Sequence, residues 1–270
     1  MSNIHASAVV HPDAQLGTGV IIGPFCTVGP KVKLGDNVKL ISHVVVDGDT
    51  TIGDGTIIYP FASVGMMSMD LKFQDESTTT GLRIGKNCKI REYATIHSGT
   101  PASDGTEIGD NCQIMVSAHI GHDCKLGNGI VLSNLVQVAG HVEIEDYAIV
   151  SAGTGIHQFC RVGRNAFIGG FSGVIMDVPP YAIFEGKPAI YRTINKVGLL
   201  RAGLSNEDMH AIHKVYSVVF AKGSDEDFMT NLDKVKKEVA DNKYAMDAID
   251  FVLNRSKRGA YHTRVLKNEE

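Results

Sequence analysis

Four of the chain's 11 histidines lie within one stretch of the sequence, at His119, His122, His141 and His157. Imidazole groups take up and release protons near neutral pH, so histidine is the most frequent general base in enzymes. Asp123 directly follows His122, and a carboxylate beside an imidazole can fix its tautomer and raise its basicity. These residue types favour proton-transfer chemistry if the fold brings them together.

Whether they meet depends on a six-residue repeat that runs through most of the chain. Aliphatic side chains occupy every sixth position from Ile4 to Val64, from Ile84 to Ile96 and from Ile108 to Val174. No helix explains this period, because six is not a multiple of 3.6. A second restricted position, often small, lies four residues after each aliphatic one, as at Ala8 and Cys26. The pattern predicts one flat face per hexad and three faces per coil of 18 residues, which is a parallel β-helix of hexapeptide repeats over residues 4 to about 180.

Glycine often follows the inward aliphatic residue, as at Gly17, Gly23 and Gly29. We expect sharp corners there that need the conformational freedom of glycine. The five cysteines fall on the small inward position, which predicts buried structural thiols in place of nucleophiles or metal ligands. They are Cys26, Cys88, Cys112, Cys124 and Cys160.

The 18-residue coil places the histidines relative to one another. His122, Gly140 and Gln158 are 18 residues apart, so we expect them to stack at one angular position on consecutive coils. His141 follows Gly140 and His157 precedes Gln158, so three imidazoles converge on one corner. Gly140, on the coil after that of His122, would let a backbone N–H approach a developing oxyanion. No serine or cysteine nucleophile motif accompanies the cluster, which favours direct attack by an acceptor hydroxyl or amine with histidine as general base.

Two interruptions of the repeat predict loops. Residues 66–83 must leave the rod and carry Asp70 and Lys72, and loops on a rigid scaffold often carry function. Residues 100–107 are expected to replace one face of a coil while keeping the phase of the repeat. On that count His97 lies on a different face and could reach the other histidines only across a subunit boundary.

Beyond Pro180 the six-residue period gives way to helical periodicity. Ser205 and Asp208 resemble a capping box that opens a helix, and further helices are predicted at about 224–239 and 244–253. We therefore divide the chain into a β-helix domain, residues 1–190, and a helical domain, residues 191–270. The helices would cover the open edge of the last coil.

Composition narrows the class of protein. The net charge of −4 gives no reason to expect a nucleic-acid partner. No apolar run is long enough to cross a bilayer, and residues 1–20 lack a secretory signal, so we expect a cytoplasmic protein without a transmembrane segment. Residues 254–267 are basic and are either a solvated tail or a docking site for an acidic partner; their cations are Arg255, Lys257, Arg258, Arg264 and Lys267.

The histidines allow two other interpretations, a zinc site and a binding protein without activity. Hexapeptide-repeat carbonic anhydrases bind zinc through three histidines, but they use a pair spaced by five, whereas His119 and His122 are spaced by three, so no metal is expected. A β-helical binding protein without activity would not need stacked histidines, and His122→Ala would separate that reading from an enzyme.

Several segments in order along the chain resemble the UDP-N-acetylglucosamine acyltransferase family, which begins lipid A synthesis. They are Ser42 to Val46, Asp70-Leu71-Lys72, Thr95-Ile96-His97, Ala118 to Cys124, Ala139 to Val142, Ile156 to Cys160, Asp177 to Tyr181, and Arg201 with Gly203.

The resemblance implies a left-handed parallel β-helix with a C-terminal α-helical domain, assembled as a homotrimer with sites between neighbouring subunits. His122 would be the general base, Asp123 its orienting partner and Gly140 the oxyanion donor. Gly170 would lie in the acyl-chain groove and leave it open to a long chain. Substrate-binding roles are implied for Asp70, Lys72, His97, His119, His141, His157, Gln158, Asn195 and Arg201.

The implied reaction moves a 3-hydroxyacyl group from acyl carrier protein, an acidic protein, to the 3-position of UDP-N-acetylglucosamine. It needs no cofactor beyond the phosphopantetheine arm of the donor. Met69, Val197 and Ala202 depart from the family's usual residues near the nucleotide-sugar site. A 3-amino UDP-sugar acceptor, giving an amide, therefore stays open, as does another hexapeptide-repeat acyltransferase. The N-acyltransferase later in the same pathway fits less well, because it has a uridine-binding domain before its β-helix.

Overall fold

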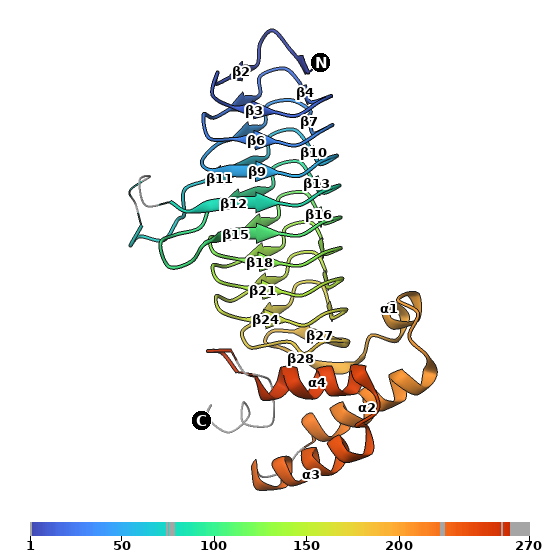
Figure 1. Cartoon of the computed structure of the whole chain (residues 1–270). Helices are drawn as coiled ribbons and strands as arrows, with labels where there is room; N and C mark the ends of the chain where they lie inside the picture. The colour runs from blue at the N-terminus through green and yellow to red at the C-terminus, as the bar shows by residue number, and fades with distance from the viewer. Residues whose placement is uncertain (1, 74, 76–78, 222–224, 255, 260–270) are drawn as a thin grey trace.

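The computed structural model describes residues 2–73, 75, 79–221, 225–254 and 256–259. These residues form a rod of stacked triangular coils, a left-handed parallel β-helix, with helices at its C-terminal end (Figure 1). The predicted fold class is confirmed. No helix in the described ranges combines the length and apolar character that spanning a bilayer requires.

Within the described residues, the strands form three sheets, one for each face of the rod. The 11-stranded sheet has the order β1 (Asn3–Ile4), β4 (Ile21–Ile22), β7 (Lys39–Leu40), β10 (Ile57–Ile58), β13 (Lys89–Ile90), β16 (Gln113–Ile114), β19 (Val131–Leu132), β22 (Ile149–Val150), β25 (Phe167–Ile168), β27 (Ala182–Gly186) and β28 (Ala189–Ile194). The nine-stranded sheet has the order β2 (Val9–Val10), β5 (Thr27–Val28), β8 (Val45–Val46), β11 (Ser63–Met66), β14 (Thr95–His97), β17 (His119–Ile120), β20 (Gln137–Val138), β23 (Gly155–Ile156) and β26 (Gly173–Val174). The eight-stranded sheet has the order β24 (Arg161–Val162), β21 (Glu143–Ile144), β18 (Lys125–Leu126), β15 (Gly105–Ile108), β12 (Gly81–Ile84), β9 (Thr50–Ile52), β6 (Lys33–Leu34) and β3 (Gln15–Leu16).

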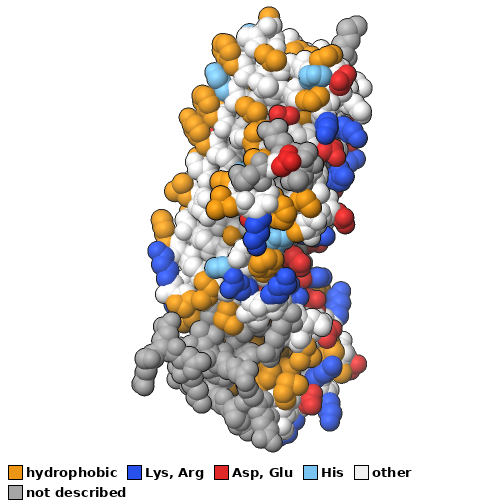
Figure 2. Space-filling model, turned by 90° about the vertical axis from the view of Figure 1, so that its left-hand side faces the viewer, with side chains coloured by type: hydrophobic (Ala, Val, Ile, Leu, Met, Phe, Trp, Pro, Cys, Tyr) orange, Lys and Arg blue, Asp and Glu red, His pale blue; other side chains and the backbone are white. Residues whose placement is uncertain are grey.

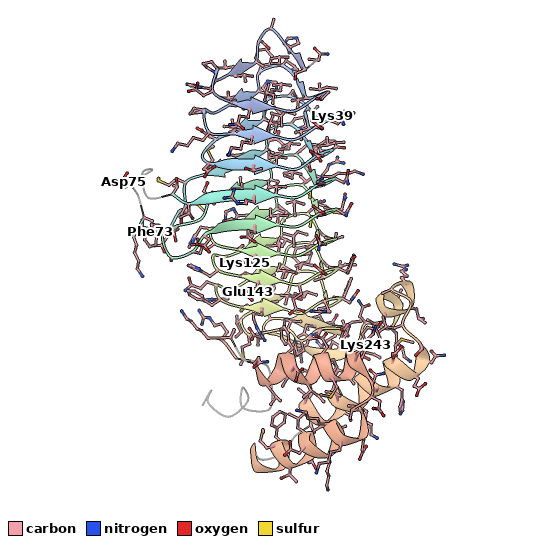
Figure 3. All side chains as sticks on the ribbon, in the orientation of Figure 1. Lys39, Phe73, Asp75, Lys125, Glu143 and Lys243 are labelled. Atoms are coloured by element: carbon pink, nitrogen blue, oxygen red, sulfur yellow. The ribbon has the colours of Figure 1, made fainter. Side chains whose placement is uncertain are left out.

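Alternation along the short strands separates the core from the surface. In a typical pair, Lys125 lies beside Glu143 on the outside while Leu126 and Ile144 meet inside. Figure 3 shows the two outward side chains one above the other. The aliphatic residue of each hexad therefore forms a continuous core along the rod axis, and the five cysteines are buried there as predicted.

The glycines after the inward aliphatics have a different role from the one expected. Gly23 does not adopt the left-handed conformation, but a Cβ there would come within 1.7 Å of the carbonyl oxygen of Ile41 on the next coil. Corners with positive φ use other residues, such as Asn37 and His43, with φ of 58° and 52°. Close approach of consecutive coils, and not a special φ, explains the glycine at this position.

Two loops leave the rod. The first joins β11 to β12, and its residues Phe73 and Asp75 project from the rod (Figure 3). The second joins β14 to β15 and inserts six extra residues, because Thr95 lies beside His119, which is 24 residues later, where a plain coil needs 18. The expectation that residues 100–107 replace one face is therefore wrong, whereas the six-residue phase is kept as predicted, because 24 is a multiple of six.

A strand hairpin closes the end of the rod before the helices begin. Strand β27 pairs with β25 in parallel, and β28 pairs with β27 in antiparallel orientation. These two strands, and not the expected helices, therefore cover the open edge of the last coil. Strand β28 continues past residue 190. Helix α2 packs against it, with the Tyr191 and Phe220 rings stacked at 4.1 Å.

The helices themselves lie near the predicted positions. They are α1 (Lys196–Arg201), α2 (Asn206–Val219), α3 (Asp225–Glu238) and α4 (Lys243–Leu253). The capping box at Ser205 and Asp208 is confirmed, with both reciprocal hydrogen bonds formed. The short helix α1 was not predicted.

Candidate active site

The outward residues of the nine-stranded sheet form the floor of an open groove of about 790 Å3. Eight of the predicted site residues line this groove. They are Asp70, Lys72, His97, His119, His122, Gly140, His157 and Gln158. The groove lies on the side of the rod that carries the first loop, the face turned to the viewer in Figure 2.

His122 and Asp123 form a hydrogen-bonded pair at the corner that follows β17. Nδ1 of His122 lies 2.7 Å from Oδ2 of Asp123, whose side chain is fully buried. Because a carboxylate accepts a hydrogen bond, this contact places the imidazole proton on Nδ1 and leaves Nε2 as the basic atom. Nε2 also lies on the side of the ring that faces Gly140, since a Cβ on that glycine would come within 2.6 Å of both Nε2 and Cε1.

The second loop supplies the other partners of Asp123. Thr100 donates its N–H and its hydroxyl to the two carboxylate oxygens at 2.8 and 2.7 Å, and the Ser103 hydroxyl donates as well. Burial disfavours the ionised form, but the hydrogen bonds from His122, Ser103 and Thr100 outweigh it and hold the pKa of Asp123 below its ordinary value. Asp123 is therefore a fixed anion behind the imidazole.

Thr100 and Ser103 are site residues that sequence reasoning missed. The break in the repeat marked their loop, but no local pattern indicated that it folds back onto Asp123. Thr106 from the same segment also contributes, because its hydroxyl accepts the backbone N–H of Asp123 at 2.9 Å.

His141 completes the cluster beside the groove. Its Nε2 lies 3.5 Å from Oδ2 of Asp123, and its ring stacks on Phe159 with centroids 4.7 Å apart. Burial lowers the pKa of His141, with Asp123 opposing that effect. The convergence of His122 and His141 on one corner agrees with the 18-residue count.

His97 lies on the same face as the other histidines, which corrects the placement derived from the repeat. Its ring contacts that of His119 edge to face, with centroids 4.9 Å apart, in one subunit. The six-residue insertion between β14 and β15 shifted the count by one face. Burial, together with the nearby His119 and His122, lowers the pKa of His97 to about 4. Nδ1 of His97 is buried without a hydrogen-bond partner among the described residues.

His119 is held by a threonine that sequence reasoning did not assign to the site. Its Nδ1 lies 2.8 Å from the Thr95 hydroxyl on the adjacent strand. Burial lowers the pKa of His119 as well, with His122 adding to the effect. Both His97 and His119 are therefore neutral at pH 7, which suits hydrogen bonding to a polar ligand better than charge pairing.

Gly140, the predicted oxyanion donor, lies beside the predicted general base. It lies against the His122 ring, and an added Cβ would come within 2.6 Å of two ring atoms, so a larger residue would displace the ring. Among the described residues, its backbone N–H donates no hydrogen bond. A free N–H beside the basic nitrogen is the arrangement that can stabilise an oxyanion formed next to a general base.

Three predicted site residues lie away from the groove. Asn195 caps α1, accepting from the Gly198 N–H and donating to the carbonyl of Asn165, and Arg201 ends the same helix. Helix α1 projects from the side of the rod opposite the first loop (Figure 1). Gly170 belongs to another corner, where an added Cβ would contact the Ala152 carbonyl oxygen at 3.4 Å.

His122, Asp123 and His141 could also be the ligands of a metal ion. One ligand atom each from His122, Asp123 and His141 lie within 4.8 Å of one another, so three ligands are available. Both Asp123 oxygens, however, already accept hydrogen bonds from Thr100, and a metal would have to displace these contacts. The donor set thus fits an oriented imidazole better than a metal centre.

Comparison with known proteins agrees with this geometry. Residues 177–261 match the family described as UDP N-acetylglucosamine O-acyltransferase, domain 2, and residues 105–140 match the bacterial transferase hexapeptide family. An acyl-[acyl-carrier-protein]–UDP-N-acetylglucosamine O-acyltransferase of Thermodesulfovibrio yellowstonii is 42% identical, with 96% of this chain and 99% of the relative covered. That of Sinorhizobium fredii is 44% identical, with 95% and 94% covered.

Solved structures of UDP-N-acetylglucosamine acyltransferases also resemble nearly the whole chain. The Francisella novicida UDP-N-acetylglucosamine acyltransferase has a TM-score of 0.90 and 40% identity, with 97% of this chain and 94% of that chain covered. The Bacteroides fragilis enzyme has a TM-score of 0.91 and 37% identity, with 96% and 99% covered. The chain therefore belongs to the family of UDP-N-acetylglucosamine O-acyltransferases.

Proposed function

We propose that the protein transfers a 3-hydroxyacyl group from acyl carrier protein to the 3-hydroxyl of UDP-N-acetylglucosamine, as the first step of lipid A synthesis. The observation that carries the proposal is the His122–Asp123 pair beside the Gly140 N–H, which has no partner within the described ranges, in a groove lined by further polar side chains. The relatives are acyl-[acyl-carrier-protein]–UDP-N-acetylglucosamine O-acyltransferases, which supports the choice of donor and acceptor.

The proposed step needs one base and one oxyanion donor. Nε2 of His122 accepts the proton of the acceptor hydroxyl while that oxygen attacks the thioester carbonyl carbon. The resulting oxyanion accepts the Gly140 N–H. The intermediate then collapses, the C–S bond breaks, and the phosphopantetheine sulfur leaves with the proton that His122 had taken. No cofactor beyond the donor's own phosphopantetheine arm enters this scheme. Asp123 stabilises the imidazolium and keeps its orientation.

Substrate contacts are proposed for the polar residues around this centre. Asp70 and Lys72 from the first loop, and His97 and His119 from the floor, would hold one substrate, with His157 and Gln158 on the adjoining wall. His141 would act through Asp123 and His122.

A homotrimer is part of the proposal, because Asn195, Arg201 and Gly170 lie away from the groove of their own subunit. A neighbouring copy would bring them to it. Location in the cytoplasm is proposed with it.

Acyl carrier protein is the proposed partner of the basic C-terminal segment. Lys257 and Arg258 lie on the rod near the groove, whereas Arg255, Arg264 and Lys267 lie outside the described residues. Electrostatic attraction of an acidic carrier would raise the rate of encounter.

A 3-amino UDP-sugar remains the second candidate acceptor, because Met69 lines the groove next to Asp70 and is 68% exposed. Val197 is exposed on α1, where it would face the same site of a neighbouring copy. Met69 and Val197 differ from the family's usual residues at positions that can contact the acceptor. Their presence would fit an acceptor whose attacking atom is a nitrogen in place of an oxygen.

The test is acyl transfer by the purified protein from a panel of 3-hydroxyacyl carrier proteins, with UDP-N-acetylglucosamine and its 3-amino analogue offered separately. His122→Ala should lower the rate about 10²–10⁴-fold. His210→Ala, an exposed histidine on α2, is the matched control and should keep the rate. Transfer only to the amine would change the acceptor but keep the mechanism, and no transfer to either sugar would reject the proposal.

A further inference from the structure

A four-residue segment after α4 returns from the helices to the rod. We call residues 256–259 the strap. Gly259 accepts the backbone N–H of Asp177 at 2.8 Å, and Ser256 donates its N–H and its hydroxyl to the Asp177 carboxylate at 3.0 and 2.6 Å. Asp177 is completely buried and also accepts from Arg161, so the strap is fixed to the last coil.

The strap brings a cation to the wall of the groove. Nε of Arg258 donates to the carbonyl of Gln158 at 3.1 Å, and Nη2 lies 2.8 Å from Nδ1 of His157. Ser256 in turn accepts the backbone N–H of Arg258 at 3.0 Å, so the arginine backbone is tied to the residue that binds Asp177. Figure 2 shows basic side chains gathered beside a histidine on this face, next to the C-terminal end of the rod.

We propose that Arg258 is a positioning residue of the acyl-transfer site, held by Asp177 through Ser256 and acting on His157 and Gln158. Both of these residues line the groove, and Arg258 itself does not. His157 and Gln158 follow β23 at a corner of the coil, and a charged fork with fixed geometry is an effective way to hold the His157 ring and the Gln158 carbonyl. This inference rests on the proposed acyl-transfer function.

The arrangement also gives the C-terminal helices a part in the chemistry. They deliver the strap at the end of α4, where the Arg161 guanidinium donates to the carbonyl of Phe251 at 2.9 Å and lies 4.0 Å from its ring centroid. The helices thus set the position of a groove wall formed by residues about 100 positions earlier in the chain.

The experiment compares Arg258→Met, Arg258→Lys and the control Lys243→Met in the full-length protein. Lys243 is a cation of the same helical region, at the start of α4 (Figure 3), where its ammonium lies 4.8 Å from the Tyr244 ring centroid. KM and kcat are measured for each substrate in turn, and amide hydrogen exchange is followed over residues 155–160.

Arg258→Met should raise the KM of the substrate that contacts His157 and Gln158 about tenfold or more, because hydrogen bonds from a charged group to this wall are lost. The KM of the other substrate should stay within about twofold of the wild-type value. Exchange over residues 155–160 should become faster. Arg258→Lys should recover part of the effect, since lysine keeps the charge but not the fork. Adding Ser256→Ala to Arg258→Met should change the KM little further, because serine acts through the arginine. Lys243→Met should match the wild type.

Two outcomes would overturn the proposal. One is unchanged KM values and unchanged exchange in Arg258→Met. The other is a fall in kcat with both KM values unchanged and a lower melting temperature, which would indicate a structural role alone. If the wild type transfers no acyl group, the proposed function fails, but the exchange data still decide whether Arg258 positions the wall.

Discussion

His122 and Asp123 are neighbours in the chain, and yet their side chains meet, with Nδ1 2.7 Å from Oδ2. In an extended strand, adjacent side chains point to opposite faces. Here Asp123 has φ of 61°, a left-handed conformation that aspartate tolerates better than most residues. The corner of the coil therefore builds the pair, and the two loop residues Thr100 and Ser103 hold the carboxylate in place.

Asp123→Asn should lower kcat about 100-fold or more while leaving KM nearly unchanged. An amide can neither stabilise the imidazolium as a carboxylate does nor ensure that Nδ1 carries the proton. Steady-state kinetics measure the effect. Ser103→Ala, which removes one hydrogen bond to Asp123 and leaves its charge, is the comparison and should lose far less. Equal losses in the two variants would show that the carboxylate charge has no special role.

Gly140→Ala should reduce kcat strongly, because the new Cβ would come within 2.6 Å of the His122 ring and force it to move. The melting temperature should change little, since Gly140 does not have positive φ. Acyl-transfer rates and thermal unfolding are measured on the same preparation. An active Gly140→Ala variant would mean that the ring does not have to stay in this position.

The stability of the protein should depend on pH through His97. Its pKa is lowered to about 4 by burial, whereas the unfolded chain binds the proton below about pH 6.5. The unfolded state therefore gains protons first as the pH falls, and stability present above pH 6.5 is lost on the way to pH 4. We expect His97 alone to cost about 2 kcal/mol between pH 7 and pH 5.

Urea unfolding at the two pH values measures this loss. His97→Asn should show a smaller loss, and the remaining slope should include His119, whose pKa is also lowered. The pKa of Asp123 is shifted downward from an already acidic range, so it contributes little in this window. An identical slope in wild type and variant would contradict the assignment to His97.

The five cysteines should resist thiol reagents in the folded protein. All are buried, which keeps reagents away from them, and burial raises the pKa of Cys124 and of Cys160 to about 12, so these two carry little reactive thiolate. Labelling without denaturant should stay near zero and approach five groups per chain in urea. Rapid labelling of any native thiol would identify a coil that opens locally.

Gly170→Met should shift donor preference toward shorter acyl chains. The Cβ of a side chain there has ordinary van der Waals contact with the Ala152 carbonyl, so the coil accepts it and the side chain projects from the rod. Competition between short and long 3-hydroxyacyl carrier proteins measures the preference. Wild type should favour the longer donors, and an unchanged preference in the variant would place the acyl chain elsewhere.

The rod could be predicted from sequence because its signal is local. Each hexad such as Ile108 to Ile114 repeats the same two inward residues, and neighbouring coils pair in one register. The hairpin of β27 and β28 was not foreseen, since residues 182–194 carry no six-residue period and pair across a turn at Lys187 and Pro188. Helix α2 was found because its capping box is a local signal as well.

The 18-residue count placed site residues correctly only where the repeat is unbroken. His122, Gly140 and Gln158 follow one another without insertion, and the count placed them correctly. His97 precedes a loop whose return depends on long-range contacts, above all those of Thr100 with Asp123, and no period in the sequence reports them. Arg258 is 100 residues from Gln158 and lay equally beyond local reasoning.

Because the coils stack at a fixed spacing, equivalent positions along the groove are separated by whole multiples of that spacing. His122, Gly140 and Gln158 are one rung apart, and each rung is set by the backbone ladder, about 4.8 Å high. A point substitution can move a side chain within a rung but cannot stretch the interval between rungs. A protein of this design can therefore lengthen or shorten its site only in whole turns of 18 residues, or fine-tune it through loops and straps that lie outside the lattice.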